Sequence, residues 1–234
     1  MELMIKYIVC SFLWMIFTNN IYAQSKFKIE KPAIQLASQY HSDIQIQNYL
    51  VSEKLDGIRA RWNGERLITR SGLTINTPKW FIHEFPNQTL DGELWIGRNK
   101  FDQVSGIVRQ KTIDNEQWKK VTFNVFDLPL SKAPFLTRYN ILQELFSTQL
   151  SPYIVLIDQK ELDSKTVLND WLNLIEIKRG EGLMLHHKAS LYEYKRSKSL
   201  LKLKKVYDAE AFVVAHINGK GKYKGMLGAM LMEM

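Results

Sequence analysis

The sequence predicts an α+β fold, because strand-like segments joined by tight turns alternate with segments of helical periodicity. Two dipeptides, Asp56-Gly57 and Asn63-Gly64, are strong hairpin signals between alternating apolar and polar residues. Residues 137–150 and 164–178 instead carry apolar side chains at the spacing of one helix face. The 234 residues, 45% of them hydrophobic, are enough for one or two domains with a real core.

Taken in order, the chain alternates between strands and helices after a polar lead-in. The predicted helices cover residues 33–40, 78–85, 101–110, 137–150 and 164–178. The predicted strands cover residues 49–51, 58–62, 66–70, 89–96, 121–127, 181–186, 200–206, 209–217 and 224–234. Asp56-Gly57 is expected to pair the first two strands, and Asn63-Gly64 the second with the third. In the last helix, the apolar stripe Val167, Leu168, Trp171, Leu172 and Ile175 predicts a core face, and Gly180 a C-terminal cap.

The N-terminus has the layout of a secretory signal peptide. Lys6 precedes an almost wholly apolar run over residues 7–17, and the I-Y-A segment that follows predicts cleavage after Ala23. The run is too short for a comfortable transmembrane helix, so an uncleaved anchor is the second interpretation. Cleavage would place the mature chain in the periplasm, without stable membrane association.

Charge and cysteine content limit the chemistry of the chain. The formal net charge of +8 and the pI near 9.4 suit a polyanionic partner, although charge alone does not exclude an ordinary basic protein. Cys10 is the sole cysteine and lies in the predicted leader. The mature chain therefore has neither a disulfide framework nor a cysteine-ligated zinc site.

Several charged residues interrupt otherwise apolar strands. Glu93 faces away from Leu94 and needs a metal ion, a ribose hydroxyl or a lysine as partner. Lys202 and Lys204 share one face of a strand, which is costly unless they meet an anion. Lys54 suits a phosphate-facing nucleophile, but an ordinary hairpin explains its surroundings equally well.

Two further segments have an open interpretation. Residues 187–198 are basic with interleaved Tyr192 and Tyr194, which suggests contact with a nucleic-acid backbone, or else a solvated loop. Phe126 lies in a cleanly alternating strand and is either a core residue or a stacking platform for a base. Periodicity does not separate these alternatives, and the core is the default.

Together and in this order, the segments resemble the nucleotidyltransferase motifs of ATP-dependent DNA ligases and messenger-RNA capping enzymes. E-K-L-D-G-I-R at 53–59 resembles the first motif, T-R-S-G at 69–72 the second and D-G-E-L at 91–94 the third. F-N-V-F-D at 123–127 resembles the aromatic motif that follows, E-G-L-M-L at 181–185 the fourth and L-L-K-L-K-K at 200–205 the fifth. Within the family, the chain is similar to the exported, minimal bacterial ligases of the Lig E type.

The resemblance implies a fold and a domain order. After the signal peptide of residues 1–23, residues 24–205 would form an ATP-grasp-like adenylation domain of two packed antiparallel sheets flanked by helices. Residues 206–234 resemble the start of an OB-fold β-barrel, which needs five strands where two are predicted. The missing part carries a sixth, basic motif in the family. An incomplete sequence, or else a naturally shortened protein, is therefore expected to form lysyl-AMP poorly and to aggregate through open strand edges.

The resemblance also implies a reaction in three steps, with ATP and a divalent metal, Mg²⁺ as the first choice, acting on nicked duplex DNA. Lys54 would attack ATP to form lysyl-AMP, AMP would pass to the 5′-phosphate of a nick, and the 3′-hydroxyl would displace it. Lys202 and Lys204 would act catalytically, by lowering the pKa of Lys54 and stabilising phosphate charge.

Other residues receive binding roles by the same resemblance. Glu53, Arg59, Arg70, Glu93, Phe126, Glu181, Lys202 and Lys204 would join Lys54 in binding ATP or AMP, with Phe126 stacked on adenine. Glu93 and Glu181 would also be the metal ligands. Arg70, Lys195, Arg196 and Lys198 would contact DNA phosphates.

Three alternatives remain at this stage. An RNA ligase or a capping guanylyltransferase would share the motifs, although export argues against capping. A non-catalytic nucleic-acid-binding remnant would keep the basic surface without AMP transfer. A structural exported protein would leave the buried charges unexplained. A monomer is the default oligomeric state.

Overall fold

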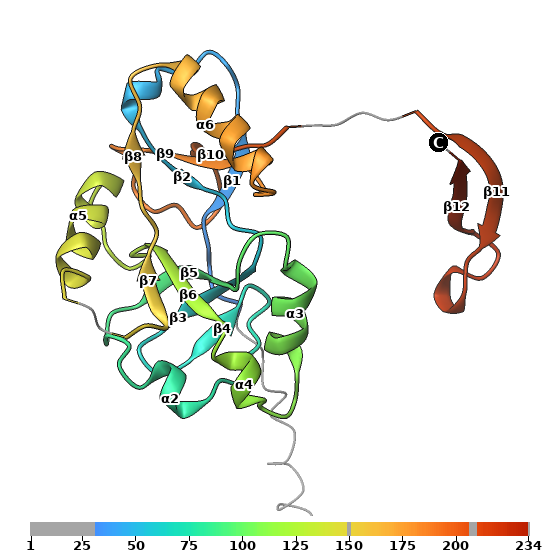
Figure 1. The fold of residues 1–234 in the computed structure, drawn as a ribbon, viewed down its shortest axis with the longest axis horizontal. Helices are drawn as coiled ribbons and strands as arrows, with labels where there is room; N and C mark the ends of the chain where they lie inside the picture. Colours follow the sequence, from blue (N-terminus) through green and yellow to red (C-terminus); the bar gives the residue numbers. More distant parts are fainter. Residues whose placement is uncertain (1–30, 149–150, 206–209, 234) are drawn as a thin grey trace, which may run out of the picture.

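Two five-stranded sheets form the main body of the structure (Figure 1). The computed structural model describes residues 31–148, 151–205 and 210–233, so the predicted signal peptide lies outside the described residues. The strands are β1 (Leu36–Gln39), β2 (Tyr49–Glu53), β3 (Ile58–Trp62), β4 (Leu67–Thr69), β5 (Leu90–Trp95), β6 (Thr122–Asp127), β7 (Ile154–Leu156), β8 (Lys160–Glu161), β9 (Leu183–His187), β10 (Arg196–Leu203), β11 (Phe212–Asn218) and β12 (Leu227–Glu233). The helices are α2 (Lys79–Ile82), α3 (Phe101–Arg109), α4 (Asn115–Trp118), α5 (Phe135–Leu145) and α6 (Lys165–Ile177), with short 3₁₀ turns at Ile46–Asn48 and Gly221–Tyr223.

The strand order confirms the predicted pair of sheets and refines it. Sheet A has the order β1-β10-β9-β2-β8, and sheet B has the order β4-β3-β5-β6-β7. Most neighbouring strands are antiparallel, but β1 and β10 are parallel, and so are β6 and β7. Each sheet is therefore mixed, not purely antiparallel as expected. Strand β1 joins β10 from the other end of the described chain, and β7 follows β6 through a crossover that contains helix α5.

The prediction that Asp56-Gly57 forms a hairpin is wrong. Strand β2 pairs with β8 and β9 in sheet A, whereas β3 pairs with β4 and β5 in sheet B. The chain therefore passes from one sheet to the other between Glu53 and Ile58. Gly57 is needed at this crossing because a Cβ atom there would lie 2.3 Å from the Leu94 carbonyl oxygen.

The Asn63-Gly64 hairpin is confirmed. Strands β3 and β4 are antiparallel, and the Asn63 amide donates to the Arg66 carbonyl at 3.2 Å. Gly64 has a φ of 99°, a conformation that glycine adopts without strain. Local turn chemistry was sufficient at this position because both strands belong to one sheet.

Residues 33–40, where the sequence predicts a helix, instead contain strand β1 (Leu36–Gln39). Leu36 and Ala37 lie opposite Arg196 and Ser197 of β10, in a parallel pair at the edge of sheet A. The hydrogen-bonding groups of an exposed sheet edge outweigh the weak helix propensity of this short segment. This error matters because the strand positions Gln35, the residue directly before it, which is 1% exposed.

Most of the remaining predicted elements are confirmed with shifts of their ends, but helix α4 and strands β7 and β8 have no counterpart in the prediction, and β10 begins four residues before the predicted strand at 200–206. Pro78 is the N-cap of α2, and helix α3 and strand β6 lie within one residue of their predicted bounds. Helix α5 begins two residues earlier than predicted and ends at Leu145. The two predicted C-terminal strands are β11 and β12, which form a sheet of their own with every residue exposed.

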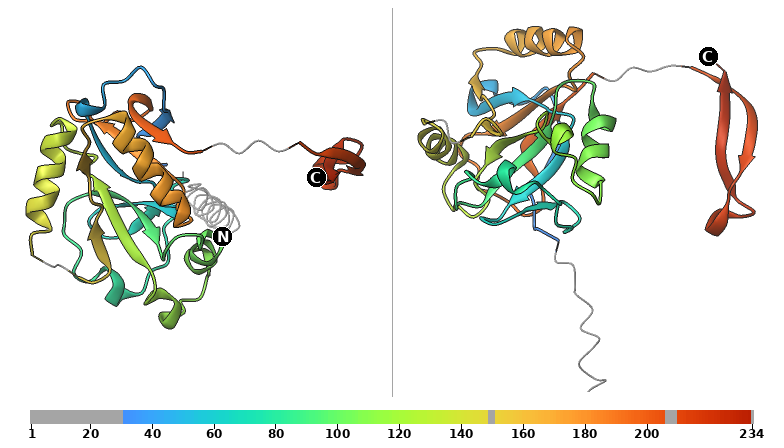
Figure 2. Two further views of the ribbon diagram at one scale, coloured as in Figure 1. Left: turned by 45° about the horizontal axis from the view of Figure 1, so that its top comes forward. Right: turned by 60° about the horizontal axis from the view of Figure 1, so that its bottom comes forward.

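Two hydrophobic cores lie on the outer faces of the sheets. Helix α6 covers sheet A (Figure 2), where Leu168 and Leu172 pack with Val51, Leu185 and Leu201. A second core on sheet B, formed with α2, α3 and α4, is built around fully buried residues: Phe81, Leu90, Leu94, Val104 and Phe123. On the inner face of sheet A, Leu50 packs with Phe135 and Tyr139 of α5, and the remaining inner surface of the two sheets lines a cavity.

The predicted stripe on α6 is core only in part. Leu168, Leu172 and Ile175 are buried, but Val167 is 44% exposed and Trp171 only packs against the edge of the core. Within the described part of the chain, no helix is long and apolar enough to cross a membrane.

Helix α6 ends in a Schellman motif whose left-handed residue is Arg179, with a φ of 58°. The Gly180 amide donates to the Ile175 carbonyl, and the Arg179 amide to the Glu176 carbonyl. We expect Arg179→Gly to raise the free energy of unfolding by about 1 kcal/mol, because glycine has no Cβ clash at this φ. Urea denaturation checks this. The control Gly180→Ala should lower stability, because the added Cβ would lie 2.5 Å from Ile175 Cγ2. An unchanged free energy of unfolding in Arg179→Gly would contradict the assignment of Arg179 as the left-handed residue of the motif.

Candidate active site

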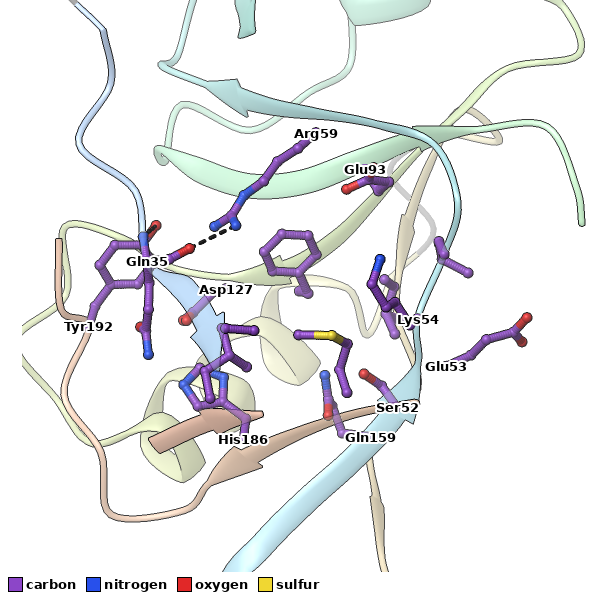
Figure 3. Close-up of a pocket in the computed structure, with 16 residues that line it drawn as sticks. Gln35, Ser52, Glu53, Lys54, Arg59, Glu93, Asp127, Gln159, His186 and Tyr192 are labelled. Atoms are coloured by element: carbon purple, nitrogen blue, oxygen red, sulfur yellow. Dashed lines mark hydrogen bonds between the residues drawn. The ribbon is translucent and has the colours of Figure 1, made fainter. Parts of the chain in front are cut away.

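A cavity of about 250 Å³ opens between the inner faces of the two sheets (Figure 3). Its wall on the side of sheet A is formed by Ser52, Lys54, Met184, His186 and Leu200. Its wall on the side of sheet B is formed by Arg59, Glu93, Phe126 and Asp127. Connecting segments contribute further lining residues, among them Gln35, Ile157, Gln159 and Tyr192. Residues from the first and third predicted motifs and from the aromatic motif therefore meet at one cavity: Glu53, Lys54, Arg59, Glu93 and Phe126 line it, and Met184 represents the fourth motif.

Lys54 lies directly after β2, where the chain leaves sheet A. Its backbone amide donates to the Gly182 carbonyl at 2.9 Å, which anchors it beside the segment before β9. The Lys54 Nζ atom donates to Glu181 Oε2 at 2.5 Å, and Lys204 Nζ donates to the other oxygen of the same carboxylate. Glu181 thus bridges two ammonium groups, which no local sequence pattern could reveal because the three residues are far apart in the chain.

Lys202 of β10 and Lys204, directly after the strand, lie on one face, as predicted. Leu201 is fully buried and Leu203 packs with it in the core beneath α6, so Lys202 and Lys204 point to the opposite face. Leu200, on that same face, lines the cavity. Lys202 is partly buried and lies opposite Met184 of β9, although it is not itself part of the cavity wall.

Glu93 and Arg59 are cross-strand neighbours on β5 and β3. Burial raises the pKa of the Glu93 carboxyl to about 8, against the opposing influence of Lys54 and Arg59. Glu93 faces the cavity while Leu94 enters the core, which confirms the predicted alternation. A carboxyl so strongly affected by desolvation, in a cavity with cations, is a mark of a functional site.

Arg59 is held rigidly by a residue to which the sequence analysis gave no role. Its Nε and Nη2 atoms donate to the two oxygens of the fully buried Asp91 at 3.1 and 2.7 Å. Its Nη1 atom donates to the Gln35 carbonyl at 2.8 Å, and Tyr192 Oη donates to Asp91 at 2.5 Å. Two donors of the Arg59 guanidinium are therefore occupied by Asp91. The central carbon of this flat group lies 5.2 Å from the centre of the Phe126 ring.

Phe126 lies on the cavity face of β6. Its two neighbours in the strand are the core residue Val125 and the buried Asp127. The neighbouring Phe123 and Val125 belong to the core of sheet B, whereas Phe126 is only partly buried. The default interpretation of Phe126 as a core residue is therefore wrong, and the ring is free to stack on a ligand. Asp127 forms two hydrogen bonds with the buried Arg138, at 2.6 and 2.9 Å.

The remaining predicted residues lie at or beyond the edge of the cavity. Glu53 accepts two hydrogen bonds from Arg98, at 2.6 and 2.7 Å, and its side chain turns away from Lys54 in Figure 3. Arg70 is exposed on the turn after β4 and is not in the cavity wall. The three predicted DNA contacts on the basic segment, Lys195, Arg196 and Lys198, are exposed as well. Lys195 forms an ion pair with Glu193.

The sequence analysis missed four residues that line the cavity, Gln35, Gln159, Met184 and His186, and also the buried Asp91 that holds Arg59. Asp91 carried a signal, because an acidic residue in an apolar strand needs a partner. The glutamines and the histidine carried none, because an isolated polar residue gives no indication of the face that it occupies. Their identification required the fold.

His186 is buried and stacks on Phe135, with ring centres 3.5 Å apart. Burial lowers the pKa of its imidazole well below the usual value, and the charge of Arg138 adds to this effect. The unfolded chain therefore binds a proton near pH 6.5 that the folded protein does not bind, so stability is lost as the pH falls below that value.

We expect His186→Gln to reduce this acid sensitivity. The difference in unfolding free energy between the wild type and the variant should fall by about 1.4 kcal/mol per pH unit below pH 6.5, and stay flat above it. Urea denaturation between pH 5 and 8 measures it. The exposed His83→Gln is the matched control, and equal slopes in all three proteins would show that His186 is solvated.

The described residues hold no group of three or more His, Cys, Asp or Glu side chains placed to bind a metal ion. Both oxygens of Glu181 are taken by lysines, and the cavity carboxylates Glu53 and Asp127 are paired with arginines. Among the described residues, this leaves Glu93 as the one carboxyl group of the cavity wall without an ion-pair partner. Mg²⁺ is commonly held by one or two carboxylates together with substrate phosphates. The residues present therefore fit a metal ion that arrives with a phosphorylated substrate, and not a metal cage made by the protein alone.

Comparisons with known proteins agree with this geometry. Residues 34–204 match the family model described as the ATP dependent DNA ligase domain. A DNA ligase of Haemophilus influenzae is 34% identical over 213 residues, which cover 91% of this chain and 78% of that protein.

Solved structures show the same relationship. A structure from a structure–function study of Lig E DNA ligases, described as DNA binding with a minimal scaffold, is 46% identical, with a TM-score of 0.79 over 87% of this chain and 80% of the other. The Chlorella virus DNA ligase-adenylate shares the fold at 20% identity, with a TM-score of 0.63 over 88% of this chain and 79% of the other. The chain therefore belongs to the ATP-dependent DNA ligases, enzymes that seal nicks in duplex DNA through a lysyl-AMP intermediate.

Proposed function

We propose that the cavity between the sheets binds ATP and that Lys54 is the residue that becomes lysyl-AMP. The single observation that carries this assignment is the position of Lys54, which lines the cavity while its ammonium group contacts Glu181. Phe126 offers an aromatic face for the base from the same cavity. Glu93 faces the cavity from sheet B and is placed to bind the ribose hydroxyls.

The first step requires Lys54 to lose its proton, because a protonated amine has no free electron pair. Glu181 already accepts a hydrogen bond from Lys54 Nζ and is the group placed to take that proton. The nitrogen then bonds to the α-phosphorus of ATP, and the bond from that phosphorus to the bridging oxygen breaks, which releases pyrophosphate. Lys204, on the far side of Glu181, remains as a cation for the phosphate oxygens.

The two later steps move AMP to the nick and away from it. An oxygen of the 5′-phosphate attacks lysyl-AMP, and the nitrogen–phosphorus bond breaks, which restores the lysine. The 3′-hydroxyl then attacks the adenylylated 5′-phosphate, and AMP leaves. A magnesium ion, when bound, would neutralise charge on the phosphates, with Glu93 as its candidate ligand, because both oxygens of Glu181 are taken by Lys54 and Lys204.

We place the DNA on the exposed basic residues that carry no role in the cavity. Arg70 and the basic segment from Lys195 to Lys198 are exposed, and the net charge of +8 suits a DNA backbone. The Lig E relative, described as binding DNA with a minimal scaffold, supports this assignment. Strands β11 and β12 would be the start of an OB-fold that helps to enclose the duplex.

Loss of single DNA contacts should appear in the salt dependence of binding. We expect Arg70→Ala and Lys198→Ala each to weaken binding to nicked duplexes of any sequence and to reduce the salt slope by about 0.9. Fluorescence anisotropy at several salt concentrations measures the slope. Lys119→Ala, an exposed lysine on the outer side of sheet B, is the control. An unchanged slope in both variants would remove these residues from the DNA surface.

The compartment and the mature N-terminus are also part of the proposal. The leader-like first 23 residues favour export to the periplasm with cleavage after Ala23. N-terminal sequencing of protein recovered from a periplasmic extract would test both points, because a mature chain that begins at Gln24 is expected. A monomer is kept as the default oligomeric state.

Peptide mapping after incubation with ATP and magnesium tests the central assignment. We expect one AMP group on the peptide that contains Lys54, and transfer of that group to nicked DNA when it is added. AMP on another lysine would overturn the assignment of the nucleophile. Transfer to nicked RNA in preference to DNA would favour the RNA ligase alternative.

A further inference from the structure

The cavity contains an unusual concentration of buried polar atoms without partners. Among the described residues, five buried side-chain polar atoms lack a hydrogen-bond partner, and three of them belong to this one cavity. These three are Gln35 Nε2, Gln159 Oε1 and His186 Nε2. Folded proteins rarely leave such atoms unpaired, because their desolvation is costly. Three in one cavity indicate that a ligand supplies the missing partners.

Gln35 is the most tightly held of the three residues, with only 1% of its surface exposed. Its backbone amide donates to Tyr192 Oη at 3.2 Å, and its carbonyl accepts from Arg59. Its side-chain oxygen accepts from the Glu193 amide at 3.4 Å, which sets the orientation of the side-chain amide group. The Nε2 atom is therefore a fixed donor that has no acceptor in the described protein.

Gln35 and His186 lie across the cavity from Lys54 and Glu93 (Figure 3). Because Lys54 is the proposed contact of the α-phosphate, the base of ATP is the part of the substrate that extends away from it. Between the two ends, Phe126 and Met184 provide apolar surfaces for the faces of the base. Gln35 and His186 are too deeply buried to touch duplex DNA, which excludes the second substrate as their partner.

We propose that Gln35 and Gln159 recognise the edge of the adenine base, a role that rests on the proposed ATP cavity. Gln35 Nε2 donates to a ring nitrogen of adenine, and Gln159 Oε1 accepts from the 6-amino group. Adenine offers this combination, with unprotonated ring nitrogens as acceptors and one exocyclic amine as donor. His186 carries the third unpaired atom, Nε2. Its ring forms the end of the cavity behind the base and is held there by stacking on Phe135.

Atom-by-atom ATP analogues test the contact of Gln35. The rate of AMP adduct formation is measured by intact mass with ATP and with its 1-deaza, 3-deaza and 7-deaza analogues. We expect one analogue to show a roughly tenfold lower kcat/KM in the wild type, the usual weight of one buried hydrogen bond. In Gln35→Met that difference should disappear, because ATP and the analogue then lack the same contact.

Two further variants separate recognition from a merely structural role. Gln35→Glu keeps the acceptor for the Glu193 amide but replaces the donor, so it should lower kcat/KM for ATP more than Gln35→Met does. Gln159→Met should remove the preference for ATP over purine riboside triphosphate, which lacks the 6-amino group. Gln39→Met, an exposed glutamine on β1, is the matched control.

The outcomes distinguish this inference from the proposed function. If the wild type forms the adduct equally well with ATP and all four analogues, the base contacts do not exist, although the ATP cavity stands. Equal slowing by Gln35→Met with every nucleotide would show a structural role and also overturn the inference. A wild type that forms no adduct with any nucleotide removes both.

Discussion

Replacing Lys54 by arginine is expected to lower ATP-dependent nick sealing by about 10⁴-fold or more, as loss of a catalytic nucleophile does in other enzymes. The guanidinium keeps the positive charge and can still pair with Glu181, whose oxygen lies 2.5 Å from the Lys54 ammonium. It stays protonated at every practical pH and so has no electron pair for the α-phosphorus. Sealing of a labelled nicked duplex measures the loss, and intact mass should show no AMP adduct.

A substrate that already carries AMP separates nucleophilic chemistry from structural damage. The last step forms no bond to Lys54, so Lys54→Arg should still seal a nick whose 5′-phosphate is adenylylated beforehand. The control Lys119→Arg changes an exposed lysine that pairs only with Glu116 among its described contacts, and it should match the wild type in both assays. Equal loss of sealing on both substrates would contradict the assignment of Lys54 as nucleophile.

Replacing Arg138 by leucine should lower the free energy of unfolding by about 3–5 kcal/mol, the usual effect of leaving one buried ion unpaired. Arg138 is fully buried and donates to both oxygens of Asp127, which is 2% exposed. It also donates to the carbonyls of Ala133 and Ser190, which would lose these bonds. Urea denaturation measures the change.

The double variant Asp127→Asn, Arg138→Leu tests the cause of that loss. The amide removes the stranded charge but keeps an acceptor for the Leu128 amide, so the double variant should be more stable than Arg138→Leu alone. Arg109→Leu, at an exposed position on α3, should change stability by less than about 0.5 kcal/mol. A double variant less stable than Arg138→Leu would show that shape, not charge, dominates at this pair.

The site could be predicted where its residues lie in a strand that alternates between core and cavity. In β5, Leu94 enters the core, so Glu93 must face the other side, and the structure confirms this. In β10, Leu201 determines the side of Lys202 and Lys204 in the same way. Phe126 shows the limit of this argument, because alternation places an aromatic residue on a face without saying whether that face is core or cavity.

Partners from distant segments could not be predicted. Glu181 meets Lys54 across 127 residues of sequence, and Tyr192 meets Asp91 across 101 residues. The hairpin expected at Asp56-Gly57 failed for the same reason, since the pairing of β2 with β9 was decided by residues far along the chain.

The sequence by itself determined the family motifs, most of the strands and helices, and the side of a strand on which each charged residue lies. These properties depend on local backbone preference and on periodicity, which a few neighbouring residues express. Only the tertiary structure decided that β2 and β3 belong to opposite sheets, that β1 closes the edge of sheet A, and that Gln35 reaches the cavity. These three features depend on which surfaces from distant parts of the chain become buried against each other. The free energy of that burial depends on both surfaces, so no single segment of sequence determines it.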